Sequence, residues 1–214
     1  MAIAYGAISA VSTSQTPTSV AVSGANTIGI VEVVGTTGTN DITAVTWGGV
    51  SMTKIAAVLN PSDRWVSTWW VANPTSGATI SFTGGSFWRS FSFYYTGAHQ
   101  TSPIDVFGTN TKVSGTGTTL STALSVTASD CWYIMTGKGG GGTQSATAGI
   151  TRMLVSADAG AVYIGDSNGT IGTGSVTGTV TNSGTQQLGQ IGFALKPAAA
   201  ASAPTNPAFL YNFV

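Results

Sequence analysis

Charged side chains are scarce in this chain of 214 residues, and those present are balanced in sign. Seven Lys and Arg residues stand against seven Asp and Glu residues, so that charged residues make up 7% of the total. Nucleic-acid binding requires clustered cations that neutralise phosphates. The basic residues here are scattered singly: Lys54, Arg64, Arg89, Lys112, Lys138, Arg152 and Lys196. We therefore expect no nucleic-acid partner.

Residues that carry nucleophilic, acid-base or zinc chemistry are nearly absent. The chain has a single Cys (Cys131), a single His (His99) and a single Glu (Glu32). Cys131 has no partner for an intramolecular disulfide, so the fold must be held by packing. No G-x-S-x-G motif accompanies His99, which we interpret as a solvent-exposed loop residue rather than a catalytic base. A structural zinc site would need more Cys and His ligands than the chain contains.

The remaining carboxylates form no spaced pair. They are Asp41, Asp63, Asp105, Asp130, Asp158 and Asp166. The run DSNGT (166–170) is typical of a turn, and it lacks the Glu that would end a calcium-binding EF-hand loop. The run GKGGGG (137–142) lacks the spacing of a phosphate-binding loop. We therefore predict no catalytic residue, no metal site and no cofactor, and hence a protein that is not an enzyme.

Long hydrophobic runs are missing too. No apolar stretch approaches the roughly 18 residues that a membrane-spanning helix needs. The opening residues MAIAYGAISA lack the basic start and the longer apolar stretch of an export signal. We expect a soluble chain that is made in the cytoplasm and has no membrane partner.

What the sequence does contain is Gly, Ser and Thr in quantity, together with 42% hydrophobic residues, which is enough for a core. The stretch ITAVTWGGVSMTKI (42–55) has alternating apolar and polar residues on both sides of a Gly-Gly pair. Glycines supply the positive φ angles of a two-residue type I′ turn, so this stretch predicts a β-hairpin. Its register places four apolar side chains on one core face: Val45, Trp47, Val50 and Met52.

Similar alternation, interrupted by Gly, Asn, Asp and Pro, extends through most of the chain. Further strands are predicted at 3–8, 20–22, 27–34, 64–72, 78–83, 87–95, 120–127, 131–136, 150–155, 161–164, 174–180 and 188–195, with a polar loop at 99–119. This rhythm is typical of a sandwich or jelly roll. We predict an all-β, antiparallel, jelly-roll-like β-sandwich over residues 1–197, followed by an Ala/Pro linker and an apolar tail over 198–214.

Two places in these strands allow more than one interpretation. Glu32 interrupts the apolar run 27–34 and is either a general acid, a metal ligand or, as we favour, an edge or rim residue that reaches water. Trp69 and Trp70 are adjacent, so they point to opposite faces of their strand. One of them is therefore a sugar platform, a subunit contact or a side chain under a loop, and we favour the last two.

Six sequence segments, taken in order, resemble segments of a known domain. They are VSGANTIGIVEVVG (22–35), ITAVTWGGVSMTKI (42–55), WWVANPTSG (69–77), YYTGAHQTSPID (94–105), DSNGTIGTGS (166–175) and IGFALKP (191–197). The chain resembles a β-sandwich domain that recurs in tailed-bacteriophage structural proteins and in bacterial surface or secreted proteins. The resemblance implies a jelly-roll-like module used for presentation or binding, and it supplies no catalytic residue.

From this resemblance we expect a non-enzymatic virion structural protein, a decoration or cement protein on the capsid of a tailed bacteriophage. Its location would be the capsid surface or tail of the virion. Its partners would be copies of itself, with a trimer as one option, and other virion proteins such as the major capsid protein. The alternative is a carbohydrate-binding module of a tail fibre or bacterial surface protein, with a glycan as its partner.

The last residues suggest how the protein attaches. Phe209, Tyr211 and Phe213 alternate in a segment that follows the Ala/Pro linker. Once the sandwich is closed by the strand 188–195, this apolar strand has nothing left to pair with in its own domain. The linker of about ten residues reaches on the order of 30 Å when extended. We therefore predict that these three aromatic residues form an assembly contact with a neighbouring copy or a capsid subunit.

Overall fold

The computed structural model describes residues 1–35, 42–60, 64–85, 87–112, 119–139, 144–155, 162–183 and 188–199. Every regular element in these ranges is a β-strand, which confirms the predicted all-β class. The strands are β1 (Ala4–Ile8), β2 (Ile28–Gly35), β3 (Ala44–Trp47), β4 (Val50–Ser51), β5 (Thr53–Asn60), β6 (Arg64–Ala72), β7 (Ile80–Thr83), β8 (Phe87–Thr96), β9 (Ile104–Lys112), β10 (Thr119–Val126), β11 (Trp132–Lys138), β12 (Gln144–Ala146), β13 (Arg152–Val155), β14 (Val162–Asp166), β15 (Gly174–Asn182) and β16 (Leu188–Leu195).

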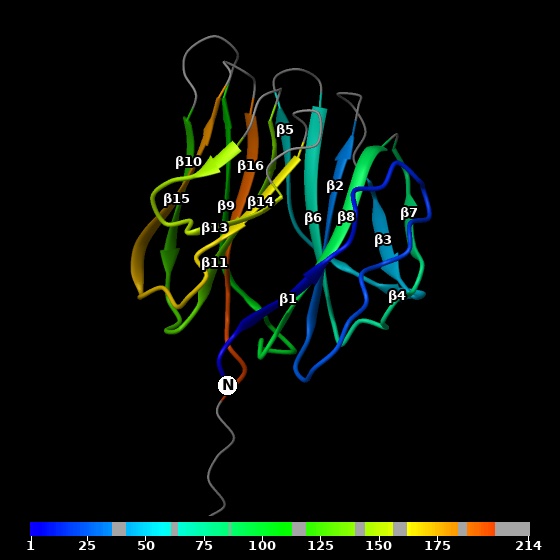
Figure 1. Ribbon diagram of the computed structural model, residues 1–214, viewed down its shortest axis with the longest axis horizontal. Coiled ribbons are helices and arrows are strands. Elements are labelled where there is room, and N and C mark those ends of the chain that lie inside the picture. Colours follow the sequence, from blue (N-terminus) through cyan, green and yellow to red (C-terminus); the bar gives the residue numbers. More distant parts are fainter. Residues whose placement is uncertain are drawn as a thin grey trace, which may run out of the picture.

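These strands form four antiparallel sheets that stack as four layers (Figure 1). Two five-stranded sheets, β1-β8-β2-β6-β5 and β13-β14-β11-β16-β9, face each other in the middle. The three-stranded sheets β4-β3-β7 and β10-β15-β12 cover their outer faces. We call the interface between the two five-stranded sheets the seam. The result is a β-sandwich with a further layer on each side.

The first half of the chain (β1–β8) and the second half (β9–β16) have the same strand order. When the strands of the second half are numbered one to eight from β9 to β16, those of its five-stranded sheet lie in the order 5-6-3-8-1. Those of its three-stranded outer sheet lie in the order 2-7-4. The first half matches once residues 17–20 count as its second strand and β4 and β5 as one strand. Residues 17–20 lie beside β7, because Thr18 bridges Thr79 and the Ile80 N–H donates to the Pro17 carbonyl at 2.9 Å. The seam therefore joins two similar units.

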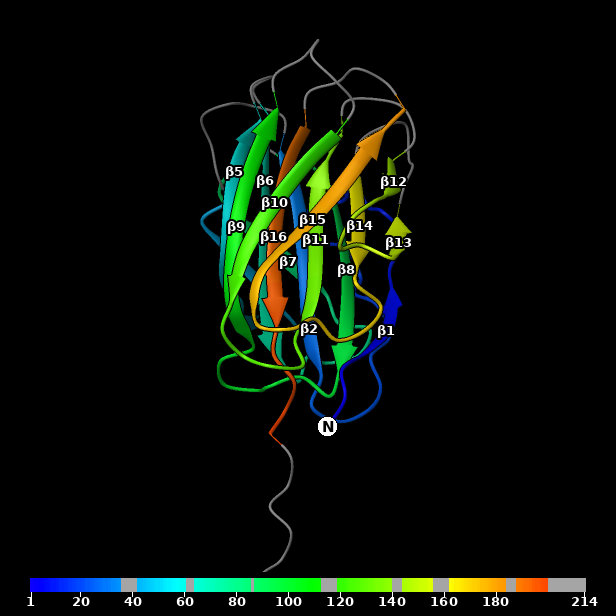
Figure 2. The ribbon, with the colours of Figure 1, turned by 90° about the vertical axis from the view of Figure 1, so that its left-hand side faces the viewer.

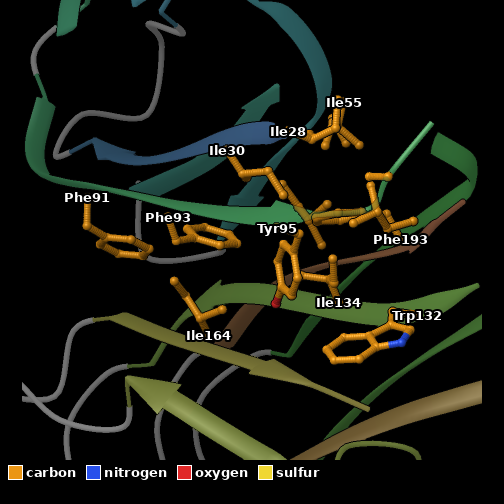
Figure 3. Packing of buried hydrophobic residues seen from close by; sticks show 14 of the residues in the cluster. Ile28, Ile30, Ile55, Phe91, Phe93, Tyr95, Trp132, Ile134, Ile164 and Phe193 are labelled. Atoms are coloured by element: carbon orange, nitrogen blue, oxygen red, sulfur yellow. The ribbon is translucent and has the colours of Figure 1, made fainter. Parts of the chain in front are cut away.

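Alternation along the strands explains why both faces of the inner sheets are covered. On β2, Ile28 and Ile30 point into the seam, where they meet Phe93 of the first half and Ile134 and Phe193 of the second (Figure 3). The intervening β2 residues pack outward against the three-stranded sheet of their own half. A strand covered on both faces reads as a continuous apolar run, as β2 does.

The predicted hairpin is confirmed in turn and register, and it belongs to an outer layer. Gly48 and Gly49 have φ angles of 59° and 82°, and Trp47 pairs with Val50. Trp47 is fully buried and donates its indole N–H to the Thr75 carbonyl at 2.7 Å. Val50 was expected on the core face but is 54% exposed, because β4 is a two-residue edge strand next to the turn.

The largest difference from the predicted elements is β9, which falls within the stretch interpreted as a polar loop. Its sequence IDVFGTNTK carries polar residues at most positions, and Phe107 is 52% exposed. Such a composition suits the edge of a sheet, and β9 is the edge strand beside β16. The short strand β12 was also missed, and no separate strand forms at 20–22.

Candidate functional site

The most elaborate polar arrangement in the described part of the chain centres on Asp166, the last residue of β14. Its carboxylate is fully buried and accepts two bonds from the Arg152 guanidinium, one of them at 3.0 Å from Nε. The Tyr95 hydroxyl donates to it at 2.8 Å, and the Asn168 backbone N–H donates at 3.0 Å. Both carboxylate oxygens are therefore satisfied.

Aromatic rings surround the guanidinium and connect the two halves of the chain. The Arg152 guanidinium carbon lies 4.7 Å from the centre of the Tyr5 ring and 5.7 Å from that of Trp132. Tyr95 makes edge contacts with both rings, at 5.9 Å from Tyr5 and 5.8 Å from Trp132. Tyr5 and Tyr95 come from the first half, and the other residues come from the second. We call these five residues the clamp, because they bridge the seam.

The electrostatics of the clamp are those of a stable ion pair. Burial raises the pKa of Tyr95 well above its usual range, and the neighbouring Asp166 carboxylate raises it further, so the phenol keeps the proton that it donates. Burial alone would lower the pKa of Arg152, but the bond to Asp166 outweighs it and the pKa is raised. Tyr95 and Arg152 therefore both keep the protons that they donate to Asp166.

A second carboxyl, that of Glu32, lies in the same seam but lacks the hydrogen-bond donors that surround Asp166. Glu32 is fully buried on β2, the middle strand of its sheet, which contradicts our expectation of an edge or rim position. Neither of its oxygens has a hydrogen-bond partner of good geometry. Burial raises its pKa well above the usual range, although the neighbouring Gly137 backbone and Thr136 hydroxyl oppose this shift. The sequence pattern was misleading because a strand covered on both faces leaves no position that reaches water.

The two buried carboxyls do not form an acidic pair. Tyr95, which touches Asp166, pairs with Ile28, and Glu32 lies four residues farther along the same strand. At about 3.3 Å per residue this corresponds to roughly 13 Å along the strand. A glycosidase pair has its carboxyl groups closer together than this and open to substrate. These two carboxyls are fully buried.

His99 and Cys131 lie apart from both carboxyls. His99 is half-buried rather than fully exposed, and its Nδ1 accepts the Ser102 backbone N–H at 3.2 Å. Cys131 is fully buried, donates to the Ala128 carbonyl at 3.3 Å, and has its pKa raised to about 11 by burial. Its thiol is therefore protonated at neutral pH and unreactive as a nucleophile.

The other acidic residues give no metal site in the part of the chain that the structure covers. Asp105 accepts bonds from the Thr127 N–H and hydroxyl and from the Ala128 N–H. These bonds outweigh its partial burial and lower its pKa, so Asp105 fixes the turn after β10. No group of three or more His, Cys, Asp or Glu residues gathers within the described ranges. Asp41, Asp63 and Asp158 lie outside them.

Aromatic side chains that could stack on a sugar are mostly inside. Trp47, Trp65, Trp69 and Trp132 are each at most 8% exposed. The Trp69 and Trp70 side chains point to opposite faces, as expected, but both faces are covered: Trp69 packs under the outer sheet, and the half-buried Trp70 packs in the seam. Each face of this strand is therefore covered by another sheet rather than by a loop.

The first and last described residues meet at one end of the molecule, which we call the terminal pole. The Met1 amino group donates to the Ala198 carbonyl at 3.3 Å, and Ala98 bridges Pro197. A shallow cleft there is lined by residues 1–2, 130, 170 and 197–199. Figure 2 shows Met1 below the sheets at this pole. The predicted assembly contact, Phe209, Tyr211 and Phe213, lies outside the described residues.

Comparison with known proteins gives no relative. No family model matches the chain, and neither the curated proteins nor the solved structures contain a significant match. A search of the described ranges also finds no helix that is long and apolar enough to cross a membrane.

Proposed function

We propose that this protein is a non-catalytic structural component of a virion, a decoration or cement protein on the capsid of a tailed bacteriophage. The observation that carries the proposal is the terminal pole. Residue 199, the last residue that the structure describes, lies at this pole together with Met1. A body with its sheets covered on both sides and with both described chain ends at one pole fits a module that is anchored at that pole and presented at the other.

The surface chemistry supports an assembly role over a catalytic one. Along β10 the exposed residues are Thr119, Ser121, Ala123 and Ser125. The hydroxyls of Ser121 and Thr179 bond to each other at 2.7 Å across to β15. An uncharged, hydroxyl-rich face lets many copies pack closely, because little like-charge repulsion opposes them.

The strand order supports a finer statement of the fold. A jelly roll has eight strands in two sheets, with the first strand next to the eighth in one sheet and the second next to the seventh in the other. Both halves of this chain have these neighbours when residues 17–20 are counted. We infer two jelly rolls in tandem. Jelly rolls occur in viral capsid proteins and in lectins, and this analogy of fold is compatible with the proposed role without establishing it.

The alternative role, a carbohydrate-binding module, has less support. Sugar platforms use exposed Trp or Tyr rings, and four of the six Trp residues are buried. The clefts at the terminal pole are lined mainly by small residues and loop side chains. Glycan-array binding by the intact protein would favour this alternative over the decoration role.

The proposal is tested by removing the tail and measuring attachment to particles. A chain ending at Ala199 should fold as the full chain does. In co-sedimentation it should bind more weakly to phage capsids that have no phage tail attached. The triple variant F209A/Y211A/F213A should behave like the truncation. A matched triple variant in the linker, T205A/N206A/P207A, should bind like the wild type. Undiminished binding by the truncated chain would contradict the proposal, as would the absence of the protein from intact particles imaged by electron microscopy.

A further inference from the structure

We propose that Glu32 is a proton-dependent latch in the seam: its carboxyl must carry a proton for the two five-stranded sheets to close on each other. This inference is independent of the proposed function. It concerns a conformational device within the fold, and it starts from the position of a single buried side chain.

The position of Glu32 leaves it no route to water. β2 has β8 on one side and β6 on the other, where Glu32 pairs with Phe91 and Thr68. The second half covers it with Thr136 and Gly137 of β11. An ionised carboxylate in such a place would cost far more than a neutral acid, because no solvent stabilises the charge.

The polar groups around Glu32 bond mainly with one another, although the Gly137 backbone and the Thr136 hydroxyl also act on its carboxyl and partly oppose the rise of its pKa. The hydroxyls of Thr68 and Thr136 bond to each other across the seam at 2.7 Å. The Tyr163 hydroxyl donates toward the Gly189 carbonyl at 3.3 Å and the Gln190 side chain at 3.2 Å. Glu32 therefore has nothing like the set of four donated bonds that Asp166 receives in the clamp.

The cations of the packed strands do not compensate. On β8, Arg89 lies two residues from Phe91, and on β11, Lys138 lies two residues from Thr136 and donates to the Gly139 carbonyl at 3.1 Å. The remaining titratable neighbour is Tyr163 on β14. At the level of Glu32, β6 and β16 present only Thr68, Gln190 and Ile191. The pKa of Glu32 stays raised in the presence of all these groups.

The direction of the pH effect follows from proton linkage. In the unfolded chain Glu32 ionises near the ordinary value, about 4.3. In the folded chain it keeps its proton above that pH. The stability of the seam is therefore complete below about pH 4.3 and falls as the pH rises from there toward the raised pKa of the folded state. The seam is therefore most stable in acid and becomes less stable as the solution becomes alkaline.

The test compares the pH dependence of urea unfolding in three proteins. The wild type and Glu32→Gln should differ little at pH 4. Above that, the unfolding equilibrium constant of the wild type should rise relative to that of the variant by up to tenfold per pH unit. Asp130→Asn removes an exposed carboxyl and should follow the wild type. A constant ratio between wild type and Glu32→Gln from pH 4 to 9 would overturn the proposal.

A second measurement needs no variant. Urea unfolding of the wild type in weakly buffered solution at pH 7 should release about one proton, because the folded chain holds a proton on Glu32 that the unfolded chain does not. Release of no proton would overturn the proposal even if Glu32→Gln failed to fold.

Discussion

Asp166 and Glu32 are two carboxyls buried in the same seam, and they differ in what offsets the free-energy cost of burying a carboxyl group. Asp166 receives hydrogen bonds from Arg152, Tyr95 and the Asn168 backbone, so its carboxylate is matched by partners from two strands and a turn. Glu32 has no hydrogen-bond partner of good geometry, and burial raises its pKa well above the usual range, which favours the protonated carboxyl. Two carboxyls that are equally buried in this core therefore differ in the number of donors aimed at them.

The clamp and the Glu32 region also hold the two halves together in different ways. The clamp is a fixed connection, because its bonds join residues of both halves and are complete. The Glu32 region contributes to closure through apolar packing, the Thr68–Thr136 hydrogen bond and the proposed neutral acid. The stability that the latch contributes should consequently depend on pH, because the pKa of Glu32 is raised in the folded state.

The largest expected effect comes from removing the acceptor of the clamp. Asp166→Ala leaves the Arg152 guanidinium, whose side chain is 29% exposed, and the buried Tyr95 hydroxyl without their shared partner. Truncating one member of a buried, hydrogen-bonded charge pair costs about 2–5 kcal/mol. Urea unfolding at pH 7 measures the loss, with Asp130→Asn as the control. A loss below about 0.5 kcal/mol would mean that the clamp does not hold the seam.

A smaller effect is expected from removing one donor. Tyr95→Phe deletes the hydroxyl that bonds to Asp166 at 2.8 Å but keeps the ring. A hydrogen bond to a charged group contributes about 1.5–3 kcal/mol, and a bond between neutral groups about 1 kcal/mol. Tyr133→Phe, which loses a bond to the Thr122 carbonyl, is the matched neutral case. Equal losses in the two variants would argue against a charged Asp166.

The smallest effect is expected outside the seam. His99 is half-buried near the terminal pole, and its ring bonds only locally, to Ser102 and Thr101. His99→Ala should change the free energy of unfolding by no more than about 0.5 kcal/mol and leave particle attachment intact. A folded His99→Ala protein that lost particle attachment would show that the terminal pole acts through this side chain.

Local patterns were sufficient to predict the fold class and much of the secondary structure. The Gly48-Gly49 pair determined the hairpin register, because only a two-residue turn with positive φ angles fits between the alternating runs. Strand β9 was missed because an edge strand needs few apolar residues. The four-layer arrangement was missed because alternation shows that a strand has two faces but not which sheet covers each.

The clamp could not be predicted because it depends on long-range register. Arg152 and Asp166 are direct cross-strand neighbours in the β13–β14 pair, and a charge of each sign fourteen residues apart was the only trace of this pairing in the sequence. Tyr95 reaches the same carboxylate from the other half of the chain. No local pattern encodes a contact across a seam between two sheets.

The most direct test of the contrast between the two carboxyls is the titration of Glu32 itself. Glu32 is the only glutamate in the chain, so selective ¹³C labelling of the glutamate side-chain carboxyl gives a single, unambiguous NMR signal. In the folded protein this signal should keep the position of a protonated carboxyl through neutral pH, while the urea-unfolded chain should titrate near pH 4.3. A folded-state signal that titrates with the same midpoint as the unfolded chain would contradict the account.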